Sequence, residues 1–154
     1  MAVKRDFEPV GARLPHMIGA LLRIPFQETV RRIHSDLMEA GFGDLRPAHF
    51  AVFQHLDPEG TRQTDLAERA QMTKQSMGYL VEHLISGGYA RREPDPADGR
   101  ASLVRLTGRG EEVAGLARTS LEALEVEWEA SLGTERYREM RAALAELAET
   151  VGRR

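Results

Sequence analysis

The feature that most constrains the fold is a change of periodicity near residue 88. Between Thr73 and Ser86 the apolar residues recur at helical spacing, and Gly87-Gly88 is expected to end this helix. Residues 89–107 instead carry two short strand-like runs, YARRE and SLVRL, separated by the turn-forming sequence PDPADGR. The sequence therefore predicts a helix that is followed directly by a β-hairpin.

A shorter helix is predicted just before this one, over residues 62–70. Thr61 is the expected cap of the short helix and Thr73 that of the longer one, because a threonine hydroxyl can accept a hydrogen bond from a free backbone amide. Two helices joined by a tight link form a helix–turn–helix, and a hairpin after the second helix is a wing. We therefore expect a mainly α fold with a small β-wing, a winged helix–turn–helix.

Further helical patterns lie on both sides of this unit. Residues 15–40 form one, in which Pro25 is expected to produce a kink or a break, and Pro47 suits the first turn of the next helix. A long helix is expected from Gly108 to Gly133, and Thr134 begins the last helix. This last helix carries a narrow 3-4-3-4 apolar seam suited to another helix, including one from a second subunit: Tyr137, Met140, Leu144, Leu147 and Val151.

Composition limits the other classes of protein. A length of 154 residues suits one domain, no apolar run is long enough to span a membrane, and the first residues lack the apolar core of a signal peptide. The absence of cysteine excludes a disulfide framework and a thiol nucleophile, so we expect a cytoplasmic protein. The net charge is −3, yet residues 61–110 hold 8 basic and 6 acidic side chains, which is the local basic footprint that DNA binding needs.

Catalytic and metal-binding motifs are not recognisable in the sequence. It contains no glycine-rich phosphate loop, no GxSxG and no HExxH, and its five histidines form no metal-ligand pattern. We therefore expect no enzymatic activity, no cofactor and no bound metal.

The helix over residues 74–86 has the features of a helix that reads DNA. Its buried stripe should consist of residues 77, 80, 81, 84 and 85, which leaves Gln75, Ser76 and Tyr79 pointing outward with Lys74 on the flank. Glutamine and serine can bond base edges, whereas lysine and tyrosine can reach phosphates. A surface helix with no DNA partner would also turn polar residues outward, and this alternative stays open.

The hairpin favours the DNA-binding interpretation. Asp98-Gly99 is expected to form its turn and to project Arg100 into a minor groove, with Asp98 paired to the Arg100 guanidinium. Arg91, Arg92 and Arg105 on the strands could add phosphate contacts. The alternative is an exposed turn with incidental charges.

At this point the sequence resembles the MarR family of bacterial regulators over nearly its whole length. The residues that carry the resemblance are 66–110, LAERAQMTKQSMGYLVEHLISGGYARREPDPADGRASLVRLTGRG, above all the segments DPADGR and LTGRG at this spacing. The resemblance implies a single domain over 1–154, with a DNA-binding lobe at 46–107. It also implies dimerisation helices at 1–45 and 108–154.

The resemblance also implies which residues contact double-stranded DNA. Lys74, Gln75, Ser76 and Tyr79 would enter the major groove, Arg100 the minor groove with Asp98 bracing it, and Thr61 would lie near a phosphate. The complete set of candidate DNA-binding residues is Thr61, Thr73, Lys74, Gln75, Ser76, Tyr79, Arg91, Asp98 and Arg100. Gly78 departs from the family pattern, in which a small hydroxyl residue is common, and leaves any base contact there in doubt.

Family members commonly release DNA when a small aromatic or anionic effector binds between the dimerisation helices and the DNA-binding lobe. The corresponding wall in this chain would comprise His16, Arg23, His49, Phe50, Phe53 and Trp128, although all six could equally be ordinary core and edge residues. Peroxide sensing by a thiol is excluded because the chain has no cysteine.

The resulting hypothesis is a transcriptional regulator that binds a pseudo-palindromic operator as a homodimer. We expect it to act as a ligand-responsive repressor. The runner-up is a winged-helix module for protein–protein interaction that never touches DNA. A third alternative is a helical dimer that binds a small molecule without regulating transcription. Salt dependence separates the first two, because DNA binding releases counterions and a protein interface of ordinary composition responds far less to salt.

Overall fold

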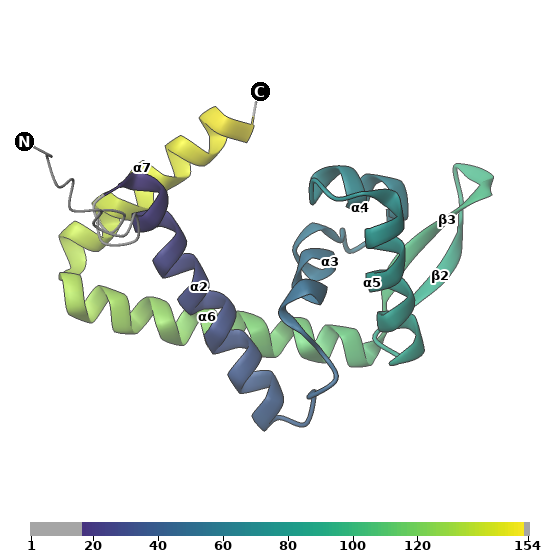
Figure 1. The fold of residues 1–154 in the computed structure, drawn as a ribbon, viewed down its shortest axis with the longest axis horizontal. Helices are drawn as coiled ribbons and strands as arrows, with labels where there is room; N and C mark the ends of the chain where they lie inside the picture. Colours follow the sequence, from purple (N-terminus) through teal and green to yellow (C-terminus); the bar gives the residue numbers. More distant parts are fainter. Residues whose placement is uncertain (1–16, 153–154) are drawn as a thin grey trace, which may run out of the picture.

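The computed structural model of the chain describes residues 17–152, and its elements follow the predicted order (Figure 1). A winged-helix lobe (residues 46–107) lies at one end, and α6 runs from this lobe to the last helix at the other end. The elements are α2 (Ile18–Glu39), the 3₁₀ helix η2 (Pro47–His49), α3 (Phe50–His55), β1 (Thr61–Arg62), α4 (Gln63–Arg69), α5 (Lys74–Ser86), β2 (Ala90–Asp95), β3 (Asp98–Leu106), α6 (Gly108–Leu132) and α7 (Thr134–Gly152).

The core of the lobe is built around α5. The Thr73 hydroxyl accepts a hydrogen bond from the Ser76 amide, so the predicted cap of this helix is confirmed. The helix ends at Gly87, and Gly88 has a φ of +75°, a left-handed conformation that favours glycine. The predicted stripe faces inward: Met77, Val81 and Leu84 are fully buried, with Leu80 and Ile85 packed against the same core.

The sheet has three antiparallel strands in the order β1-β3-β2. The hairpin of β2 and β3 is the predicted wing, whereas β1 was not expected. Thr61 and Arg62 pair with Val104 and Leu103 of β3, so this two-residue strand ties the start of α4 to the wing.

Of the two outcomes expected at Pro25, the structure excludes the break, because Pro25 lies inside the continuous helix α2. The carbonyl that loses its amide partner falls in an exposed part of the helix, where water can bond it. The prediction for Thr61 is wrong. Thr61 does not cap α4, because Arg62 occupies the N-cap position and makes no side-chain capping bond there. The Thr61 hydroxyl instead bonds both the amide and the carboxylate of Asp57 and fixes the turn before β1.

The flanking helices α2, α6 and α7 contrast with the lobe in their exposure. The N-terminal half of α2 and the seam of α7 leave large apolar side chains uncovered: Ile18, Leu21, Leu22, Ile24, Phe26, Leu144, Leu147 and Val151. Only Tyr137 is buried in α7. Neither α2, α6, α7 nor any other helix in residues 17–152 is long and apolar enough to cross a membrane.

Candidate nucleic-acid interface

The N-terminal half of α5 presents a polar surface that the rest of the lobe leaves open. Lys74, Gln75 and Ser76 are exposed, and Tyr79 retains 69% of its accessible surface. Gln75 Nε2 donates to the Tyr79 hydroxyl at 3.3 Å, and the Thr73 hydroxyl donates to Ser76 Oγ at 2.9 Å. These groups therefore hold one another in place while their outer atoms stay available to a partner.

Gly78 does not belong to this open surface. A Cβ at Gly78 would lie 3.0 Å from Nε2 of Gln63, so the position marks a close approach of α5 to α4. Gln63 also accepts a hydrogen bond from Arg92 of the wing at 2.7 Å. The glycine that departs from the family pattern thus faces the neighbouring helix.

The wing carries Arg100 on an irregular part of β3. Asp95 pairs with Asp98, whereas the preceding Pro94 pairs with Ser102, so Gly99, Arg100 and Ala101 have no partners on β2. Such a bulge bends a strand and re-aims a side chain. Within the described residues, the Arg100 guanidinium makes no hydrogen bond or ion pair, and it remains exposed.

Two further predictions, both about the tip of the wing, are wrong. Pro96 and Ala97 form the turn, and Asp98 and Gly99 already belong to β3. The Asp98 carboxylate accepts the backbone amide of Arg100 at 3.1 Å and does not pair with its guanidinium. An Asx-type turn explains the shift, because Asp95 Oδ1 accepts the Ala97 amide at 2.8 Å and Pro96 presets the backbone between them.

Arg62 of β1 contacts the wing, and sequence reasoning missed this residue. Its Nε donates to Asp95 Oδ2 at 2.7 Å, and its Nη2 lies 2.5 Å from the same oxygen and 3.7 Å from Asp98 Oδ2. The Ala97 amide, and after it the Arg62 guanidinium, hold the pKa of Asp95 below its ordinary range. No local sequence pattern predicts the pairing of Arg62 with Asp95, because the two residues are 33 positions apart.

The other wing arginines are engaged within the protein. Arg91 pairs with Glu93 at 2.7 Å, and Arg105 lies 3.1 Å from the other oxygen of that carboxylate. Arg92 donates to Glu82 of α5 at 2.6 Å and thereby joins the wing to the helix. The guanidinium of Arg91 is already paired with Glu93, so the predicted phosphate contact of Arg91 would have to share it with this carboxylate.

A second group missed from the sequence lies where the lobe meets α6. The Tyr89 hydroxyl donates to Asp44 Oδ1 at 2.7 Å and accepts from Arg109 Nη2 at 3.1 Å, and the Arg109 guanidinium lies 4.7 Å from the centre of the Tyr89 ring. The Tyr89 hydrogen bond is the main cause that lowers the pKa of Asp44. This group ties the segment after α2, the start of the wing and the start of α6 into one joint.

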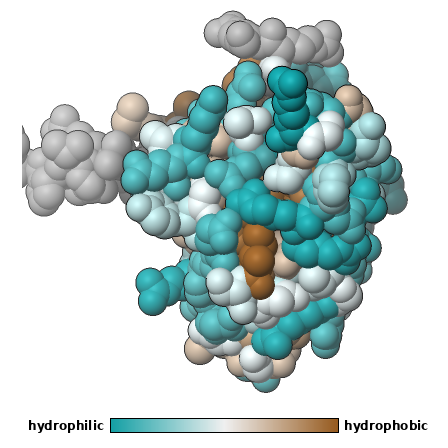
Figure 2. Space-filling view, turned by 90° about the vertical axis from the view of Figure 1, so that its right-hand side faces the viewer, coloured by the Kyte–Doolittle hydropathy of each residue, from teal (hydrophilic) through white to brown (hydrophobic). Residues whose placement is uncertain are grey.

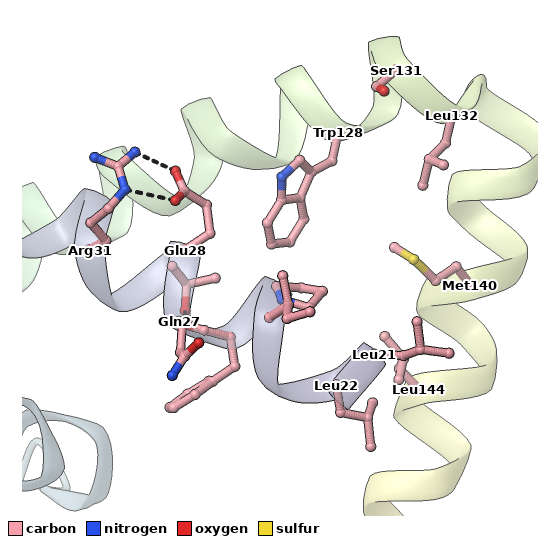
Figure 3. A pocket seen from close by; sticks show the side chains of 14 residues that line it. Leu21, Leu22, Gln27, Glu28, Arg31, Trp128, Ser131, Leu132, Met140 and Leu144 are labelled. Atoms are coloured by element: carbon pink, nitrogen blue, oxygen red, sulfur yellow. Dashed lines mark hydrogen bonds and ion pairs between the residues drawn. The ribbon is translucent and has the colours of Figure 1, made fainter. Parts of the chain in front are cut away.

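The residues expected to line an effector pocket are dispersed. Trp128 lines an apolar hollow of about 1000 Å³ between α2, α6 and α7, together with Leu21, Met140 and Leu144 (Figure 3). Arg23 does not line it, although it donates to Gln27, which does. His16 lies outside the described residues.

The remaining three expected pocket residues lie in the lobe. Phe50 is buried in the core, and Phe53 packs against it. His49 is buried and stacks on His83 with ring centres 4.2 Å apart, and burial lowers the pKa of His49. None of the three lines the hollow around Trp128. Residues 17–152 contain no group of three or more histidine or acidic side chains that could hold a metal.

The face formed by α4, α5 and the wing is predominantly hydrophilic (Figure 2). An exposed polar helix and an unpaired arginine on a bulged ribbon lie on the same lobe. Such an arrangement can place a helix in a major groove and a cation in the adjacent minor groove.

Comparison with known proteins agrees with this geometry. The profile of the MarR family matches residues 44–101. Transcriptional regulator HosA of Escherichia coli O111:H- is 34% identical over 97 residues, which cover 62% of this chain and 68% of HosA.

Solved structures extend the similarity beyond the lobe. A crystal structure of MarR superposes with a TM-score of 0.72 at 25% identity, covering 88% of this chain and 98% of that one. Transcriptional regulator Tm0710 of Thermotoga maritima gives 0.62 at 27% identity, with 88% and 94% covered. CouR of Rhodococcus jostii RHA1, solved with bound p-coumaroyl-CoA, shares the fold at a TM-score of 0.67 and 23% identity, with 86% and 92% covered. The chain therefore belongs to the MarR family of transcriptional regulators and has its winged-helix fold.

Proposed function

We propose that this protein is a cytoplasmic, ligand-responsive repressor that binds a pseudo-palindromic DNA operator as a homodimer. The observation that carries the proposal is the position of two DNA-reading groups on one lobe. The exposed start of α5 offers Lys74, Gln75, Ser76 and Tyr79 to a major groove, and the bulge of β3 offers Arg100 to the neighbouring minor groove. Arg91 and Asp98 would act at the edges of this contact.

The homodimer is supported by the exposed apolar surface of the flanking helices. Leu144, Leu147 and Val151 form a seam along α7, and the apolar start of α2 lies across the hollow from that helix. A seam with this spacing favours contact with another helix, and a second copy of the chain supplies one. Two lobes related by a two-fold axis would bind half-sites about one helical turn apart, roughly 10 base pairs.

The proposed effector is a small aromatic or anionic molecule. The related fold of CouR holds p-coumaroyl-CoA, which combines both properties. Trp128 offers an aromatic wall to such a ligand. The ligand would act by binding better to a dimer whose two α5 helices have the wrong separation for DNA, which shifts the population away from the operator.

Fluorescence anisotropy with the DNA immediately upstream of the protein's own gene tests the function. We expect tight binding that survives random competitor DNA and weakens steeply with salt, with a log–log slope of about −0.9 for each phosphate contacted. Arg100→Ala should weaken binding at least about tenfold, since it removes a desolvated cation from the minor groove. A matched Arg118→Ala variant on α6, distant from the wing, should bind as the wild type does.

Two results would contradict the proposal. Binding that is insensitive to salt would favour the protein–protein interaction module, because a protein interface of ordinary composition releases few counterions. Binding no tighter than to random DNA, repeated with fragments selected from the whole genome, would exclude sequence-specific regulation.

A further inference from the structure

Arg62 stands at a position where an arginine is poorly suited to its local role. It is the N-cap of α4, where serine, threonine, aspartate and asparagine are preferred because their oxygens accept a free helix amide. The Arg62 side chain accepts none, and α4 begins without a side-chain cap. The helix forgoes this hydrogen bond while the guanidinium points to the wing.

The guanidinium reaches the place where the wing loses its regular pairing. Asp95 is the last residue of β2, its side chain is 8% exposed, and both Nε and Nη2 of Arg62 lie within 2.7 Å of its Oδ2. Asp98, across the turn, lies 3.7 Å from the same Nη2. One cation therefore faces the carboxylates on both sides of the two-residue turn.

Each carboxylate in turn holds one backbone amide of the tip. Asp95 Oδ1 accepts the Ala97 amide at 2.8 Å, and Asp98 Oδ1 accepts the Arg100 amide at 3.1 Å. The second of these amides belongs to the residue that the bulge displays. A continuous set of contacts thus runs from β1 through the two aspartates to the backbone of Arg100.

From this set of contacts we propose that Arg62 is a positioning residue for the wing, which fixes the bulge and thereby the direction in which Arg100 meets DNA. The proposal rests on the proposed DNA-binding function. Arg62 itself does not touch DNA; it neutralises Asp95 and faces Asp98, which would otherwise present two negative charges beside the phosphates. Gly99 leaves the bulge backbone freedom that this ion pair removes.

The test uses Arg62→Thr in the full-length protein. Threonine supplies the missing N-cap oxygen, which offsets part of the stability lost when Asp95 loses its partner, so the variant should still fold while it lacks the guanidinium. Arg62→Lys restores a single cation that cannot face both carboxylates as a fork, and it should give an intermediate result. Arg69→Ala is the matched control, since Arg69 lies at the other end of α4, pairs with Asp57 at 2.8 Å and is similarly exposed, at 44% against 38% for Arg62.

The first readout needs no DNA. Backbone order parameters from NMR relaxation at residues 97–101 should fall in Arg62→Thr from values typical of a rigid backbone, about 0.85, to below about 0.6. They should stay at the wild-type level in Arg69→Ala. Unchanged order parameters in Arg62→Thr would overturn the proposal.

The second readout is a double-mutant cycle with Arg100→Ala, measured as operator affinity. Arg62→Thr should weaken binding about tenfold when Arg100 is present and less than twofold when it is absent, because its effect passes through Arg100. Equal losses in both backgrounds would make Arg62 a direct phosphate contact and overturn the positioning role. If residues 97–101 become mobile in Arg62→Thr but the wild type binds no DNA, the positioning role of Arg62 is upheld and the proposed DNA-binding function is overturned.

Discussion

The winged-helix lobe and the flanking helices differ in how completely each buries its apolar surface. In the lobe, the large side chains on the inner faces of α4, α5 and β3 have almost no exposure, as Leu66, Met77 and Val104 illustrate. In α7, Leu147 and Val151 retain 44% and 61% of their surface. The lobe therefore completes its core within one chain, whereas the flanking helices carry an apolar surface that a single chain leaves uncovered.

The largest expected effect comes from placing a charge on this uncovered surface. In the proposed homodimer, Leu144→Glu should weaken dimerisation at least about 100-fold, because a symmetric interface would lose the burial of two leucines, each worth about 1.5–3 kcal/mol, and gain two charges. Sedimentation equilibrium over a range of concentrations measures the dissociation constant.

A matched charge separates the seam from the rest of α7. Ala142 is exposed on the side of α7 opposite to the seam, so Ala142→Glu should leave the dissociation constant near that of the wild type. Equal weakening by both variants, or a Leu144→Glu protein that remains dimeric, would show that the exposed seam is not the interface.

A smaller effect is expected at the joint between the two regions. Tyr89→Phe removes the hydroxyl that bonds Asp44 and Arg109, and it should lower the free energy of unfolding by about 1–2 kcal/mol at neutral pH. The loss should diminish in acid. The native pKa of Asp44 lies below its ordinary value near 4, so its contribution is present above about pH 4 and is lost as the pH falls through the native pKa.

Urea unfolding at pH 7, 5 and 3 measures this dependence. The difference between wild type and Tyr89→Phe should be similar at the two higher pH values and smaller at pH 3. A difference that persists undiminished at pH 3 would mean that the Asp44 carboxylate contributes nothing through Tyr89.

The smallest effect is expected inside the lobe, at Gly78. Alanine is favoured over glycine in a helix by about 1 kcal/mol, and the new Cβ would meet only the flexible end of the Gln63 side chain. The hydrogen bond from Gln63 to the Lys74 carbonyl is long, at 3.4 Å, so a small shift sacrifices little. Gly78→Ala should therefore raise the free energy of unfolding by up to about 1 kcal/mol, which urea titration can resolve. A loss of stability would show that the approach of α4 to α5 is too tight for any side chain.

Much of the fold could be predicted, because local periodicity and capping residues specify the helices and their ends. The stripe of Met77, Val81 and Leu84 and the cap at Thr73 are confirmed, as is the helix boundary at Gly133-Thr134. The strand β1 could not be predicted, because two residues show no alternation and pair only through contact with β3. The expected turn at Asp98-Gly99 does not form, because Asp95 and Pro96 close the hairpin two residues earlier.

The site was less predictable because its supports are distant in sequence. The exposure of Lys74, Gln75 and Tyr79 follows from helical spacing, and the structure agrees with it. The contacts of Arg62 with Asp95 and of Tyr89 with Asp44 join residues 33 and 45 positions apart, and no local motif specifies them. The hollow around Trp128 depends on how α2 and α7 meet α6, which periodicity leaves undetermined.

The helix α6 connects the lobe to the hollow around Trp128 and can transmit movement between them. Its 25 residues span about 37 Å at a rise of 1.5 Å per residue, with Arg109 of the joint at one end and the hollow near the other. A tilt of about 5° over this lever moves the far end by roughly 3 Å, close to the 3.4 Å rise of one base pair along a DNA strand. In the proposed dimer, a small tilt of α6 would therefore shift the two α5 helices relative to each other by about one base-pair step.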